Sequence, residues 1–131
     1  MSLYVITMNG CPGCEKYKKN IHPTLSEKLK GMVKYTVVEK SETNLLPEKI
    51  KSINKTWYPM LIYEDSKGNL HVFNGIIVNG ETKMQNKYKW DTQEILKWLC
   101  NSSMDGTSII CQFNGDGSVK MLINNPLISL I

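Results

Sequence analysis

The most constraining feature of the sequence is Cys11-Pro12-Gly13-Cys14, which stands between a predicted strand and a predicted helix. The run before it, residues 3–7, is apolar and rich in β-branched side chains, which predicts a buried strand. After the motif, apolar residues recur every three or four positions as far as Leu29, which predicts an amphipathic helix with a kink at Pro23. The chain must therefore turn sharply from strand to helix at its first two cysteines.

The following elements predict an α/β fold with the order β-α-β-α-β-β-α. A long helical crossover joins the first two strands, so they should pair in parallel, and the turn at Gly68 should make the last pair antiparallel. We expect a mixed four-stranded sheet flanked by helices. The further strands are predicted at residues 33–38, 60–63 and 70–73, and the further helices at residues 45–53 and 91–100.

Two segments exceed this minimum. Residues 75–90 carry turn signals at Asn74-Gly75 and Asn79-Gly80 and should form an extended loop or a small ribbon. Residues 108–123 predict an added C-terminal hairpin, followed by an apolar tail at 127–131. We expect residues 1–104 to form one domain and residues 105–131 an extension that packs on it or on a partner subunit, as in a homodimer.

Composition favours a soluble, cytoplasmic protein that binds neither nucleic acid nor membranes. The net charge of +4 comes entirely from lysines, which are spread along the 131 residues, and arginine is missing. Nucleic-acid-binding proteins usually concentrate charge and use arginine to contact phosphates and bases. No apolar run approaches the length of a membrane helix, and the first nine residues are typical of a strand and not of a signal peptide. The lysine- and asparagine-rich composition suggests an AT-rich genome, such as that of a large DNA virus.

The spacing of Cys11 and Cys14 suits thiol–disulfide exchange. A thiolate at the start of a helix is stabilised by free N–H groups and the helix dipole, so Cys11 is the predicted attacking thiol. Cys14, one turn further on, would resolve the mixed disulfide. Half of a zinc site is the alternative, with the other ligands drawn from His22, His71, Cys100 and Cys111. Because these four are not closely paired, we expect neither a metal nor a cofactor.

With a strand leading into Cys-x-x-Cys and Tyr58-Pro59 placed before the hairpin strands, the chain resembles the thioredoxin/glutaredoxin superfamily over residues 3–100. The resemblance implies a thioredoxin-like fold and a cis Pro59 beside the two sulfurs. It also implies that the backbone of Tyr58 pairs with an extended substrate segment. The substrate-binding residues would then be Pro12, Gly13, Tyr58 and Pro59, with Trp57 either lining the groove or packing inside.

The resemblance implies a thiol–disulfide oxidoreductase that acts on protein disulfides. Its own dithiol would be reduced by an upstream reductase or oxidised by a sulfhydryl oxidase. Gly10 stands where thioredoxins carry tryptophan, and no lysine precedes the motif as it does in glutaredoxins. Two alternatives stay open, a glutathione-dependent glutaredoxin and a non-catalytic interaction module on the same fold. We expect Cys100 and Cys111 to be small core residues and not a second redox pair.

Overall fold

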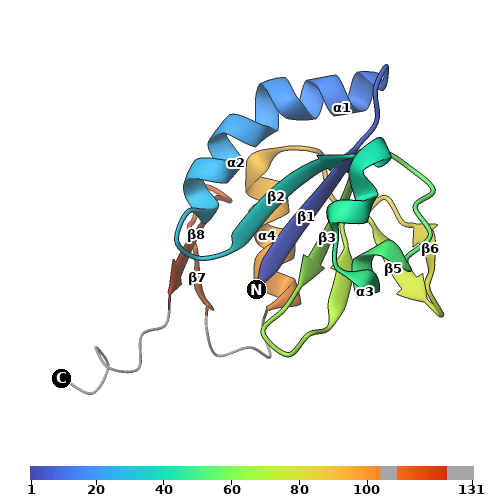
Figure 1. Ribbon diagram of the computed structural model, residues 1–131. Coiled ribbons are helices and arrows are strands. Elements are labelled where there is room, and N and C mark those ends of the chain that lie inside the picture. Colours follow the sequence, from blue (N-terminus) through green and yellow to red (C-terminus); the bar gives the residue numbers. More distant parts are fainter. Residues whose placement is uncertain (104–108, 124–131) are drawn as a thin grey trace.

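The centre of the structure, a computed structural model that describes residues 1–103 and 109–123, is a four-stranded sheet. β1 (Ser2–Thr7) pairs in parallel with β2 (Lys34–Glu39) and antiparallel with β3 (Met60–Glu64). β4 (Leu70–Val72) pairs antiparallel with β3, so the strand order is β2-β1-β3-β4 (Figure 1). This confirms the expected mixed α/β architecture.

The crossover from β1 to β2 is helical throughout. It consists of α1 (Pro12–Lys16), a π-helical turn at Tyr17–Ile21 and α2 (His22–Leu29). Pro23 has no N–H to donate, and its ring would clash with the preceding turn of a regular α-helix. The wider π-helical turn ends at Ile21, two residues before Pro23. The helix therefore continues through Pro23 as expected.

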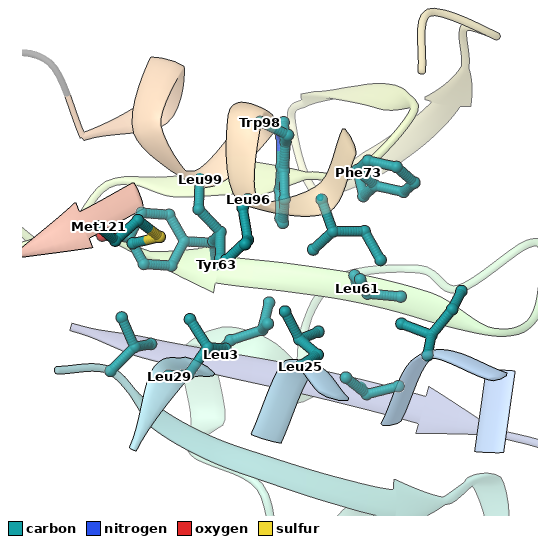
Figure 2. Packing of buried hydrophobic residues seen from close by; sticks show 14 of the residues in the cluster. Leu3, Leu25, Leu29, Leu61, Tyr63, Phe73, Leu96, Trp98, Leu99 and Met121 are labelled. Atoms are coloured by element: carbon teal, nitrogen blue, oxygen red, sulfur yellow. The ribbon is translucent and has the colours of Figure 1, made fainter. Parts of the chain in front are cut away.

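One face of the sheet is covered by the long crossover helix and by α4 (Thr92–Ser102), as Figure 2 shows. Asp91 begins α4 as its N-cap, and its Oδ1 accepts the Glu94 N–H at 2.8 Å. Burying each large apolar side chain contributes roughly 1.5–3 kcal/mol to this core. The cluster includes Leu3, Leu61 and Tyr63 from the strands, Leu25 and Leu29 from α2, and Leu96 and Leu99 from α4.

The opposite face is covered by α3 (Glu48–Lys51) and the residues that flank it, through Leu46, Ile50 and Ile53, whereas the preceding 3₁₀-helical segment at Lys40–Leu45 buries no side chain. The expected helix at residues 45–53 is thus much shorter than predicted. Leu46 is extended because a residue before proline avoids helical backbone angles, and Pro47 caps the helix that follows. No helix in the described part of the chain is long and apolar enough to cross a membrane.

The segment predicted as a loop or ribbon is a hairpin of β5 (Gly75–Val78) and β6 (Glu81–Met84). Its two-residue turn, Asn79-Gly80, has positive φ angles of 53° and 78°. Two successive left-handed residues suit the twist of a tight hairpin, and asparagine followed by glycine adopts them readily. Here we name β5 and β6 together the ribbon.

The predicted C-terminal hairpin is also present, as β7 (Ile109–Phe113) and β8 (Val119–Ile123), and it packs against α4. Cys100 of α4 lies in the core and Cys111 of β7 packs against it, but a disulfide joins the two, which the expectation of two small core residues did not include. Docking of the hairpin brings the two sulfurs together, which their spacing alone does not reveal. The expected domain boundary at residues 104 and 105 and the apolar tail at 127–131 lie outside the described residues.

Candidate active site

Cys11 lies at the junction between β1 and the crossover helix. Gly10, with a φ of +72°, turns the chain out of the strand, and Pro12 begins α1 where an N–H would have no helical partner. Cys11 is the N-cap residue, and its Sγ accepts the N–H of Cys14 at 3.2 Å. The sulfur thus lies where free helix N–H groups and the helix dipole stabilise a thiolate.

Cys14 lies one helical turn further on and is completely buried, whereas Cys11 is 8% exposed. Its Sγ accepts the N–H of Met8 at 3.4 Å, and both cysteines are free thiols. Burial, followed by the hydrogen bond with the Cys11 side chain, raises the pKa of Cys14 to about 11. Cys14 is therefore a protonated thiol at neutral pH.

The Tyr58–Pro59 peptide bond is cis, as the resemblance implied, and it lies beside the motif. Cys11 Sγ is 3.5 Å from the carbonyl oxygen of Tyr58, to which the thiol donates. A Cβ placed on Gly13 would be 3.5 Å from Pro59 Cδ. The structure thus brings together Cys11, Cys14, Gly13, Tyr58 and Pro59, with Pro12 exposed at the first turn of α1.

Lys18 and Glu39 are site residues that sequence reasoning missed. The charge of Lys18 acts on Cys14 and opposes the effect of burial on its pKa. Lys18 Nζ is 3.3 Å from Glu39 Oε1, and Thr7 Oγ1 donates to the same oxygen at 3.2 Å. The spacing of four residues from Cys14 to Lys18 could have indicated the lysine. Glu39 reaches the site because β2 pairs Thr7 with Glu39, which the sequence does not show.

A groove of about 430 Å³ opens beside Gly13 and Pro59. Tyr17 of the crossover helix lines it, together with Trp57 and Tyr58 from the loop before β3. Trp57 was expected either to line a groove or to pack inside, and it does both. The ribbon and the segment after it add Met84, Asn86 and Trp90, a contribution that the sequence did not reveal.

The residues named as further zinc ligands have other partners. Cys100 and Cys111 are bonded to each other, His22 Nδ1 lies 2.9 Å from Tyr35 Oη, and His71 Nε2 lies 2.9 Å from Asp65 Oδ2. In residues 1–103 and 109–123, no three His, Cys, Asp or Glu side chains are grouped so that they could hold a metal ion. Around the motif, the described structure therefore offers the thiols of Cys11 and Cys14 and backbone N–H groups, without a further zinc ligand from these four residues.

Comparison with protein-family models, curated proteins and solved structures found no match to this chain. The functional argument therefore rests on the geometry around Cys11.

Proposed function

We propose that the chain is a thiol–disulfide oxidoreductase of the thioredoxin superfamily that acts on protein disulfides. The observation that carries the proposal is the position of Cys11, whose sulfur accepts a helix N–H at 3.2 Å and lies 3.5 Å from the carbonyl of a cis-proline loop. This is an arrangement in which one sulfur can ionise and attack while the buried Cys14 waits as a thiol.

The topology supports the superfamily assignment. The strand order β2-β1-β3-β4, with one parallel pair followed by two antiparallel pairs, resembles the thioredoxin fold. The position of the crossover helix and α4 on one face, with α3 on the other, resembles it too. In such a fold the motif follows the C-terminal end of the central strand β1, where a substrate can approach.

Reduction of a client disulfide would proceed in two exchanges. The Cys11 thiolate attacks one client sulfur, the client S–S bond breaks, and the other client sulfur leaves as a thiolate that takes up a proton. Cys14 then gives up its proton and attacks Cys11 Sγ, which releases the second client sulfur. Two electrons pass from the Cys11–Cys14 dithiol to the client, and the reverse sequence is oxidation.

Trapping of the mixed disulfide tests the proposal. The Cys14→Ser variant should form a stable disulfide between Cys11 and a reducible protein such as insulin, detected on a non-reducing gel and mapped by mass spectrometry. The Cys11→Ser variant is the matched control and should trap nothing, because the remaining thiol is buried and protonated. Absence of trapping, together with no insulin reduction by the intact protein, would contradict the proposal.

Two observations bear on glutathione and on compartment. No lysine stands before Cys11, where glutaredoxins carry one that binds glutathione, so we propose protein clients and not glutathione. We also propose a cytoplasmic location with an upstream reductase or sulfhydryl oxidase as partner. Disulfides are rare in that compartment, and the Cys100–Cys111 bond joins a buried Cys100 to a partly exposed Cys111.

A second candidate function is assembly through the C-terminal hairpin, as a homodimer or as an interaction module. Ile110 and Leu122 are cross-strand partners, and with Phe113 they are 50%, 41% and 59% exposed. Light scattering on the intact protein and on an Ile110→Glu, Leu122→Glu variant tests this. A dimer that the charges dissociate supports assembly as a homodimer, and a monomer in both cases contradicts the homodimer.

A further inference from the structure

One wall of the groove beside Cys11 is formed by residues outside the four-stranded sheet. Met84 ends β6, and Trp90 precedes the N-cap of α4. We propose that these two residues, with Trp57, select client proteins that carry a bulky apolar side chain close in sequence to the target cysteine. The inference rests on the proposed oxidoreductase function and names the class of its substrate.

The ribbon is fastened to the loop that carries Trp57 and the cis-proline. Gly80 O accepts the Asn54 N–H at 2.9 Å, and Thr82 Oγ1 donates to Asn54 O at 2.7 Å. A Cβ at Gly75 would be 2.8 Å from Trp57 Cη2, so the indole lies directly against the ribbon backbone and only glycine leaves it room. The groove wall and the loop beside Cys11 therefore form one connected unit.

The rim of the groove exposes large apolar side chains that the core does not use. Met84 is 52% exposed and Trp90 is 42% exposed. Trp90 is nevertheless held in place, because its ring packs edge-on against the buried Phe73 with centroids 4.9 Å apart. A fixed aromatic ring and a flexible methionine that line the same groove are well suited to bury an apolar side chain of variable shape.

The polar lining indicates a peptide and restricts its charge. Of the described residues that line the groove, Lys16 is the one charged residue, and none is a carboxylate. Asn20 and Asn86 are exposed there, and amide side chains can bond the backbone of an extended segment. The groove volume is within the range of ligand-binding pockets. The occupant is therefore a neutral or acidic client segment with a bulky apolar side chain. A client lysine or arginine in the groove would lie near the like charge of Lys16, with no carboxylate among the described lining residues to pair with it.

The test compares two disulfide-linked fluorescent peptides that differ at one position beside the cysteine, phenylalanine in one and serine in the other. The reduced intact protein is mixed with each peptide, and the second-order rate constant of disulfide exchange is measured. We expect the phenylalanine peptide to react about tenfold faster, as a well-filled apolar pocket discriminates by 1–3 kcal/mol. Met84→Lys and Trp90→Ala should each bring the ratio close to one.

Two controls separate selection from folding and from chemistry. Phe113→Ala removes an aromatic of the C-terminal hairpin that is even more exposed than Trp90 and should leave the preference intact. Hydroxyethyl disulfide, which is too small to fill the groove, should react with the wild type, Met84→Lys and Trp90→Ala at equal rates. Equal rates with both peptides in the wild type, or a preference that survives both groove variants, would overturn the inference. Failure of the wild type to reduce even hydroxyethyl disulfide would instead overturn the proposed function.

Discussion

At the residue scale, the two sulfurs of the motif differ in what surrounds them. Cys11 Sγ accepts a helix N–H, while Cys14 is enclosed and its pKa is raised to about 11. The pKa of an unperturbed cysteine is 9.0. At neutral pH, Cys14 therefore holds about a hundredfold less thiolate than an ordinary cysteine. The order of events in exchange follows from this difference, because the thiolate is the attacking species.

Limited alkylation should therefore distinguish the two cysteines. With a substoichiometric amount of iodoacetamide at neutral pH, we expect modification of Cys11 at least tenfold faster than of Cys14, measured by peptide mass spectrometry. Modification of Cys14 should increase as the pH rises toward about 11, where its thiolate becomes abundant. Equal modification of both residues at neutral pH would show that burial does not protect Cys14.

Asp65 lies in a different part of the molecule, the turn between β3 and β4, and its carboxylate accepts hydrogen bonds there. Burial would raise the pKa of its carboxyl, but hydrogen bonds from His71 and from the N–H groups of Asn69 and Lys67 outweigh it and hold the pKa at about 2. Because this folded-state pKa lies below the value of 3.8 for an unfolded chain, the stability due to ionised Asp65 is complete above about pH 4. It is lost as the pH falls toward 2.

Asp65→Asn should lower the free energy of unfolding by about 1–2 kcal/mol at pH 6, since it weakens the charge-assisted hydrogen bonds of a buried carboxylate. Urea unfolding at pH 6 and at pH 2.5 measures the effect, and the difference from the wild type should shrink at the lower pH. Asp116→Asn, in the exposed turn between β7 and β8, is the matched control and should change stability much less. An Asp65→Asn effect that is independent of pH would contradict the account.

At the element scale, α4 connects two regions with different tasks. The residue before its N-cap, Trp90, lines the groove, while Cys100 near its other end bonds to β7. Cys100 stands nine positions after Asp91, which is about 13 Å along the helix axis. The disulfide is thus a cross-link that holds the C-terminal hairpin on α4, and we expect it to take no part in exchange at Cys11.

Replacing both Cys100 and Cys111 by serine should destabilise the fold and leave exchange unchanged. The bond spans a sequence separation of 11, and closing a loop of that length stabilises a protein by about 2–3 kcal/mol. Urea unfolding of the variant and of the oxidised wild type measures the difference, with insulin reduction as the second measurement. Unchanged stability, or lost insulin reduction in a folded variant, would show that the cross-link has another role.

At the scale of the whole molecule, the sheet was predictable where local patterns agree with the fold. The β-branched run of β1, the Asn79-Gly80 turn and the Asp91 cap each carry a local signal, and each appears where the sequence places it. The helix before β3 was predicted too long because the extended backbone before Pro47 outweighs an apolar pattern that spans it.

The candidate site was predictable only in part. The cysteines and Pro59 lie in motifs, so their positions could be expected. Glu39, Met84 and Trp90 reach the site through strand pairing and through the docking of the ribbon, which are tertiary events without a local signal. The Cys100–Cys111 pair was missed for the same reason, since its closure depends on where the last hairpin packs.

A redox titration with peptide mapping tests the central claim most directly. The intact protein is equilibrated in glutathione buffers of increasing oxidising strength, acid-quenched and analysed by mass spectrometry. The account predicts that a Cys11–Cys14 disulfide forms and opens reversibly in a single two-electron step, while the bond at Cys100 stays closed throughout. Cys11 and Cys14 that never bridge at any ratio of oxidised to reduced glutathione would contradict it.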